Sequence, residues 1–91
     1  MKIALSKPFN YEGKEYSDLN LDIENMTGED LEAAERILRA TGDTPVVPEL
    51  SKAYQAILAA KAAQVPIEMI RALPAKDYSK ITMAVGNFLM Q

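Results

Sequence analysis

The sequence contains no cysteine and no histidine among its 91 residues. Without cysteine, the chain cannot form disulfides, iron–sulfur clusters or thiolate zinc sites. Without histidine, it lacks the side chain that most often serves as general base and as metal ligand. Its four glycines form no glycine-rich phosphate-binding loop. We therefore expect no enzyme, no metal site and no cofactor.

The charge balance is acidic, with 10 lysines and arginines against 13 aspartates and glutamates and a net charge of −3. This sign disfavours a protein that grips nucleic-acid phosphates. Two acidic groupings are interpreted as a solvated strand end and a favourable helix N-terminus rather than as a cation site. No stretch has membrane-spanning length and no signal peptide is visible. The composition predicts a soluble intracellular interaction module, with residues 1–91 as a single domain.

The first quarter of the chain alternates between apolar and polar residues. Apolar side chains of one parity recur in two runs, 3–11 and 19–23, and Gly13 between them can take the positive φ of a tight turn. The pattern predicts a β-hairpin. Pro8 has no N–H for a strand ladder, so the first strand should be an edge or bent strand. A change of parity predicts a bulge near Ser17 and Asp18.

After Met26 the spacing of apolar residues becomes helical. Thr27 and Asp30 form a capping box, which predicts that a helix starts after Thr27, and Gly42 would end it in the left-handed conformation. The residues predicted to form its buried stripe are Leu31, Ala34, Ile37 and Leu38.

Three further helices are expected. Pro48 is placed as the first residue of an alanine-rich second helix with a buried stripe from Leu50 to Val65. A short third helix runs over 67–73, and a last helix runs from about Ala75 to the C-terminus. The predicted fold class is α+β. An N-terminal β-hairpin (1–25) packs on a small bundle of three to four helices (27–91).

The last helix has two apolar sides. A broad stripe from Tyr78 to Leu89 should face the core, and a narrower strip of Met83, Gly86 and Met90 lies roughly opposite. Burial of both sides is the commoner arrangement in so small a protein. If the strip is exposed, its pliable methionines suit a surface that binds a long apolar partner helix. Met83 and Met90 are then the first candidates for partner contact, with Met69 as an extension.

Residues 60–70 have roughly the spacing of a DNA-binding helix-turn-helix. The would-be recognition helix offers Glu68, Met69 and Arg71, and it is cut short by Pro74. Recognition helices need several donors for base edges and several cations for phosphates. A DNA-binding regulator of a prophage therefore remains an alternative and is not the preferred interpretation.

The order of segments along nearly the whole chain resembles the tail assembly chaperone family of long-tailed bacteriophages, which includes the Mu-like and P2-like chaperones. No single motif is diagnostic, and the capping-box and Leu-Pro-Ala-Lys-Asp-Tyr segments weigh most. The segments that carry the resemblance are 5–9, 11–16, 19–22, 26–31, 34–36, 45–51, 59–62, 73–78 and 85–89.

This resemblance implies a non-enzymatic role. Such chaperones bind the tape measure protein, a very long and mostly helical chain, and help tail tube subunits polymerise around it. They act in the cytoplasm of the bacterial host and are absent from the mature virion. In many such phages a frameshift makes a longer form that engages the tail tube protein, and this chain would correspond to the shorter form. Homo-oligomerisation and a role as a structural tail component remain open.

Overall fold

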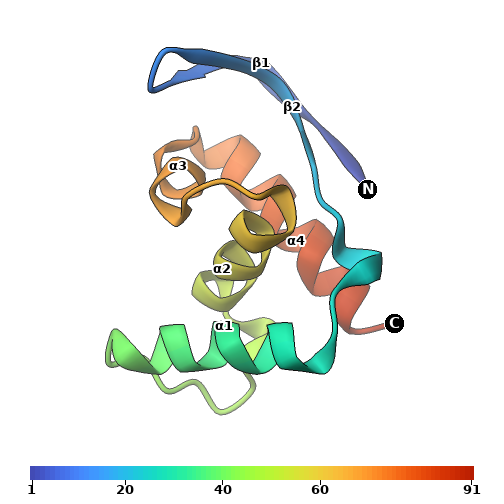
Figure 1. Ribbon diagram of the computed structural model, residues 1–91, viewed down its shortest axis with the longest axis vertical. Coiled ribbons are helices and arrows are strands. Elements are labelled where there is room, and N and C mark those ends of the chain that lie inside the picture. The colour runs from blue at the N-terminus through green and yellow to red at the C-terminus, as the bar shows by residue number, and fades with distance from the viewer.

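The chain folds into an N-terminal antiparallel β-hairpin followed by four α-helices, which confirms the α+β prediction. A computed structural model describes all residues from 1 to 91. The hairpin and helix α1 lie at opposite ends of the molecule, with α2 and α4 between them (Figure 1). The elements are β1 (Lys2–Tyr11), β2 (Lys14–Asn20), a 3-10 turn η1 (Ile23–Asn25), α1 (Gly28–Ala40), a 3-10 turn η2 (Pro48–Leu50), α2 (Lys52–Ala63), α3 (Ile67–Ala72) and α4 (Ala75–Leu89).

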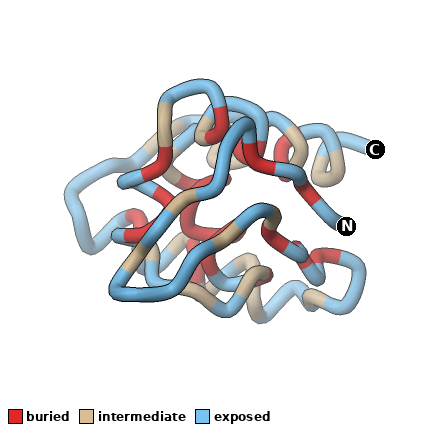
Figure 2. Tube along the Cα trace, turned by 90° about the horizontal axis from the view of Figure 1, so that it is seen from above, coloured by how far each residue is buried: buried red, intermediate tan, exposed pale blue.

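Helix α2 is the centre of the core. Eight of its twelve residues are buried, and four of those eight are alanines. Alanine is the best helix former, and its small side chain lets neighbouring backbones approach closely. Helices α1, α3 and α4 and the turn η2 all contact α2. Figure 2 shows buried segments gathered in the middle of the molecule, with exposed backbone around them.

The hairpin closes through a two-residue turn at Glu12 and Gly13. Both residues have positive φ, 49° and 81°, which is typical of the type I′ turn whose twist matches that of paired strands. The expectation for Gly13 is therefore confirmed. Glu12 adopts the left-handed conformation without being a glycine.

The strand pairing is irregular between the pair Ala4–Asp18 and the pair Phe9–Tyr16. Four residues of β1, Leu5–Pro8, thus oppose Ser17 alone. The bulge was expected at Ser17 and Asp18, and the register shift occurs at that level, but the extra residues belong to β1. Pro8, which cannot donate to the ladder, lies in the bulged segment.

The bulged part of β1 is bonded to helix α4. The backbone N–H and the hydroxyl of Ser6 donate to the two carboxylate oxygens of Asp77, each at 2.9 Å. Lys80 Nζ donates to the carbonyl oxygen of Ala4 at 2.8 Å. Asp77 is buried. The outer edge of β1 therefore finds hydrogen-bond partners on α4, and the hairpin is fixed over the helices.

Helix α1 begins and ends at the predicted signals. Thr27 is the N-cap, and its backbone N–H donates to Asp30 Oδ2 at 2.9 Å. Gly42 has a φ of 92° just beyond the helix. The predicted buried stripe is wrong in one place, because the Ile37 side chain is half exposed. Helix α1 packs mainly on α2, and its fully buried residues are Ala34 and Leu38.

The predicted start of the second helix is also wrong. Pro48 opens the short turn η2, and α2 starts four residues later, at Lys52. Ser51 is extended, with φ −81° and ψ 125°, and its hydroxyl accepts a hydrogen bond from the backbone N–H of Tyr54 at 3.3 Å. Ser51 is therefore the N-cap. This break rotates Leu50 out of the buried stripe, and 64% of its surface is exposed.

Asp77→Ala should destabilise the protein by about 1–3 kcal/mol, because it leaves the Ser6 donors without their charged acceptor. For a chain of this size the melting temperature should fall by roughly 5–15 °C. Thermal unfolding followed by circular dichroism measures the effect. Asp43→Ala, on an exposed loop, is the matched control and should stay within about 0.5 kcal/mol of the wild type. Equal effects of the two changes would show that the Ser6–Asp77 contact contributes nothing.

Candidate partner-binding surface

Helix α4 has one buried face and one exposed face. Ile81 and Val85 are completely buried against the core. Met83 and Met90 lie on the opposite side with 59% and 61% of their surfaces exposed. Of the two interpretations of the methionine strip, exposure is therefore the correct one for these two residues, and the hairpin does not cover them.

The exposed methionines form one side of an open groove between α4 and η2. The groove has a volume of about 210 Å³. Leu50, Met83 and Met90 supply its apolar surface. The complete lining is Leu50, Lys52, Gln55, Met83, Gly86, Asn87 and Met90, and these seven residues are called the α4 groove below.

A close contact between Gln55 and Gly86 shapes the α4 groove. Gln55 is buried on α2, and its Nε2 donates to the carbonyl oxygen of Glu49 in η2 at 2.7 Å. A Cβ on Gly86 would lie 2.6 Å from that same nitrogen. The amide of Gln55 therefore fits against α4 because residue 86 has no side chain. From there it holds η2, which carries Leu50, in place.

Three of the four residues proposed from the sequence come together here. Met83, Gly86 and Met90 all line the α4 groove. Met69 does not, because it is completely buried inside α3 and belongs to the core. A surface role for Met69 is not compatible with this position.

Sequence reasoning missed the other four groove residues, three of which come from other elements. These are Leu50 on η2, Lys52 and Gln55 on α2, and Asn87 on α4. The extended backbone at Ser51 turns Leu50 outward. This feature could have been predicted, because serine is a typical residue at the start of a helix. Nothing in the local sequence indicates that Gln55 packs against a glycine of α4.

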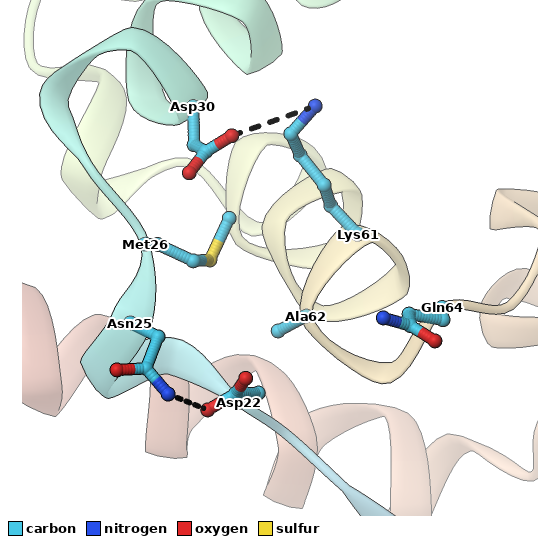
Figure 3. A pocket seen from close by; sticks show the side chains of 7 residues that line it. All are labelled: Asp22, Asn25, Met26, Asp30, Lys61, Ala62 and Gln64. Carbon is cyan, nitrogen blue, oxygen red and sulfur yellow. Dashed lines mark hydrogen bonds and ion pairs between the residues drawn. The ribbon is translucent and has the colours of Figure 1, made fainter.

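A second hollow, of about 150 Å³, lies where the chain leaves the hairpin (Figure 3). Its polar side chains interact with one another: Asn25 Nδ2 donates to Asp22 Oδ1 at 2.9 Å, and Lys61 lies 4.0 Å from Asp30. The backbone N–H of Asp22 donates to the carbonyl oxygen of Ala62 at 3.1 Å. These contacts join η1 and α1 to α2, and we interpret the hollow as a joint between elements.

A third hollow separates α1 from η2, with the ring of Tyr54 among its lining residues. Burial raises the pKa of the Tyr54 phenol, and the carboxylates of Glu49 and Glu35 raise it further. The phenol therefore stays protonated and donates to the carbonyl oxygen of Leu31 at 3.2 Å. This hydrogen bond ties α2 to α1, so Tyr54 has a structural role.

The structure offers little support for a metal site, a membrane-spanning segment or a DNA-binding helix. No three histidine, cysteine, aspartate or glutamate side chains are grouped so as to hold a metal ion. No helix is long and apolar enough to cross a membrane. Helix α3, the counterpart of a DNA recognition helix, has six residues and carries Arg71 as its one basic side chain. Such a helix offers too few cations for phosphate contacts.

The fold and the α4 groove define a small α+β protein whose distinctive surface is suited to contact with another polypeptide. Comparison with protein families supports this class. The family described as "Phage tail assembly chaperone proteins, E, or 41 or 14" matches residues 2–90. The chain belongs to this family of phage tail assembly chaperones. Comparison with curated proteins and with solved structures found no match.

Gly86→Ala should give no net gain in stability, although glycine-to-alanine changes in helices commonly stabilise a protein by up to about 1 kcal/mol. The new Cβ must displace the Gln55 amide and break its bond to Glu49, which offsets the gain. Urea unfolding measures the balance. The NMR signal of the Gln55 side-chain amide should shift.

Gly28→Ala is the control for this change. Gly28 opens helix α1, and a Cβ there would meet nothing within 4 Å. This variant should be stabilised by about 0.4–1 kcal/mol. An equal gain from Gly86→Ala would contradict the role assigned to the Gln55 contact.

Proposed function

We propose that this protein binds the tape measure protein of its phage through the α4 groove and keeps it available for tail tube assembly. The observation that carries the proposal is the exposure of Leu50, Met83 and Met90 on one groove of a tail assembly chaperone. Monomeric proteins seldom leave large apolar side chains clustered on their surface unless another polypeptide covers them. The role is one of binding, with no chemical step.

The size of the groove indicates how such binding works. Covering three side chains that are each about 60% exposed contributes about 3–5 kcal/mol in total. Association itself costs about 4 kcal/mol or more in lost translational and rotational freedom. One copy therefore binds weakly, and stable coating needs several contacts along one long partner. Repeated weak contacts on a long helical chain supply that stability through avidity.

The adaptable side chains of the groove suit a partner that presents many different segments. Methionine is unbranched and flexible, so Met83 and Met90 can pack against varied apolar side chains. Met83 lies on α4 seven residues before Met90, two helical turns away, which matches the spacing of anchors on an amphipathic partner helix. The chaperone acts in the host cytoplasm and leaves before the virion is complete, so purified tails should not contain it.

The double variant Met83→Ser/Met90→Ser should abolish co-purification with the tape measure protein when the two are co-expressed. Thermal unfolding should change little, because both side chains are largely exposed. Retention of the tape measure protein by this variant would contradict the proposal.

Met69→Ala is the matched control for the methionine variants. Because Met69 is completely buried, its truncation should cost about 2–5 kcal/mol of folding stability. At a temperature where it remains folded, this variant should still bind the tape measure protein. A fall in melting temperature of the Met83/Met90 variant as large as that of Met69→Ala would show that the exposed methionines stabilise the fold instead.

A further inference from the structure

The exposed face of α4 differs in charge from the rest of the protein. The chain has a net charge of −3, yet the single acidic residue of α4, Asp77, is buried and bonded to Ser6. The solvent-facing side of α4 therefore carries no carboxylate side chain. Its exposed residues at helical spacing are Lys76, Ser79, Lys80, Met83, Asn87 and Met90.

Charge and apolar surface are arranged in sequence along this face. The lysines occupy its first two turns, and the methionines occupy its last two, so the face is basic at one end and apolar at the other. Lys76 and Met90 are separated by about 21 Å at 1.5 Å per residue. Lys52 of α2, another lining residue of the α4 groove, adds a third ammonium group beside the helix.

These ammonium groups have no carboxylate partner within the protein. The ion pairs of the chain involve the N-terminus, Lys2, Lys61 and Arg39. Lys80 donates to the carbonyl oxygen of Ala4, and Lys52 donates to Thr82 Oγ1 at 3.1 Å. Lys76 makes neither a hydrogen bond nor an ion pair. A negatively charged occupant would supply the missing partners.

We infer that the segment bound by the α4 groove is an amphipathic helix with an apolar ridge and an acidic end. The ridge packs on Leu50, Met83 and Met90, and the aspartates or glutamates lie beside the lysines of the first two turns. This inference rests on the proposed function and specifies the chemistry of the bound segment. Opposite charges placed in this way set the direction of the helix in the groove and raise its association rate.

A second copy of this chain is the competing occupant. Helix α1 has Glu29 and Glu32 exposed in its first half and the half-exposed Ile37 in its second half, so it carries a weaker version of the same pattern. Its second half also bears Arg36 and Arg39, which would weaken its fit to a basic face. We therefore favour a separate polypeptide as the occupant.

The test uses two synthetic helical peptides as probes, with the intact protein. Both carry the same leucine ridge, and one has four glutamates at one end where the other has four lysines. Fluorescence anisotropy measures binding at 50 and 300 mM NaCl. The acidic peptide should bind at least fivefold more tightly than the basic one at low salt, and this preference should shrink at high salt.

Lys76→Glu is the diagnostic variant, because Lys76 supports no contact within the fold. It should weaken binding of the acidic peptide about three- to tenfold. Arg36→Glu makes the same change of charge at an exposed position of α1 that does not line the α4 groove, and should alter binding less than twofold. Equal effects of the two variants, or equal binding of the two peptides, would overturn the inference.

Further readouts separate this inference from the proposed function. If the full tape measure protein co-purifies but neither peptide binds, the inference is overturned and the proposed function stands. If the acidic peptide binds as described but the tape measure protein does not co-purify, the proposed function fails and the inferred binding chemistry stands. Light scattering decides about the second copy: an oligomer that Lys76→Glu converts to monomers would identify α1 of another copy as the occupant and overturn the inference.

Discussion

The burial of α2 among α1, α3, α4 and η2 is the constraint on which the rest of the structure depends. Its alanines allow these elements to approach closely. Helix α4 covers it with Ile81 and Val85. Because the residues of a helix point in all directions, the same rotation that buries these two turns Met83 and Met90 outward. The exposed strip is therefore a consequence of how the core is built.

The hairpin limits where a partner can reach the helices. A two-stranded sheet is only marginally stable by itself, so this one depends on the apolar surface beneath it and on its bonds to α4. Asp77 and Lys80 hold β1 along one side of α4 through Ser6 and Ala4. The side of α4 that bears Asp77 is therefore covered by β1, while Lys80 stays exposed at its margin. On the side toward η2, the helical structure is interrupted at Ser51 and α4 is left uncovered. The α4 groove is formed there.

The features that could be predicted from the sequence are those that depend on near neighbours. The capping box at Thr27, the turn at Gly13 and the helix end at Gly42 each involve residues a few positions apart, and all three are present. Packing between distant segments was harder to predict. Periodicity could not separate the buried Met69 from the exposed Met83, since a six-residue helix shows too little of its pattern.

The groove lies where three elements meet. The methionine strip on α4 was predicted from the sequence, but the contributions of the other two elements were not. Gln55 reaches from α2 to the carbonyl oxygen of Glu49 and packs against Gly86, so it organises η2 and α4 together. The groove is thus preformed, and binding does not require it to rearrange. Under the proposed function, the weak binding of each copy follows from the small apolar area of the groove. A small, preformed surface exchanges quickly, since affinity among related complexes is set mostly by the rate of dissociation. Under the proposed function, rapid exchange would let later tail components replace the chaperone on the tape measure protein.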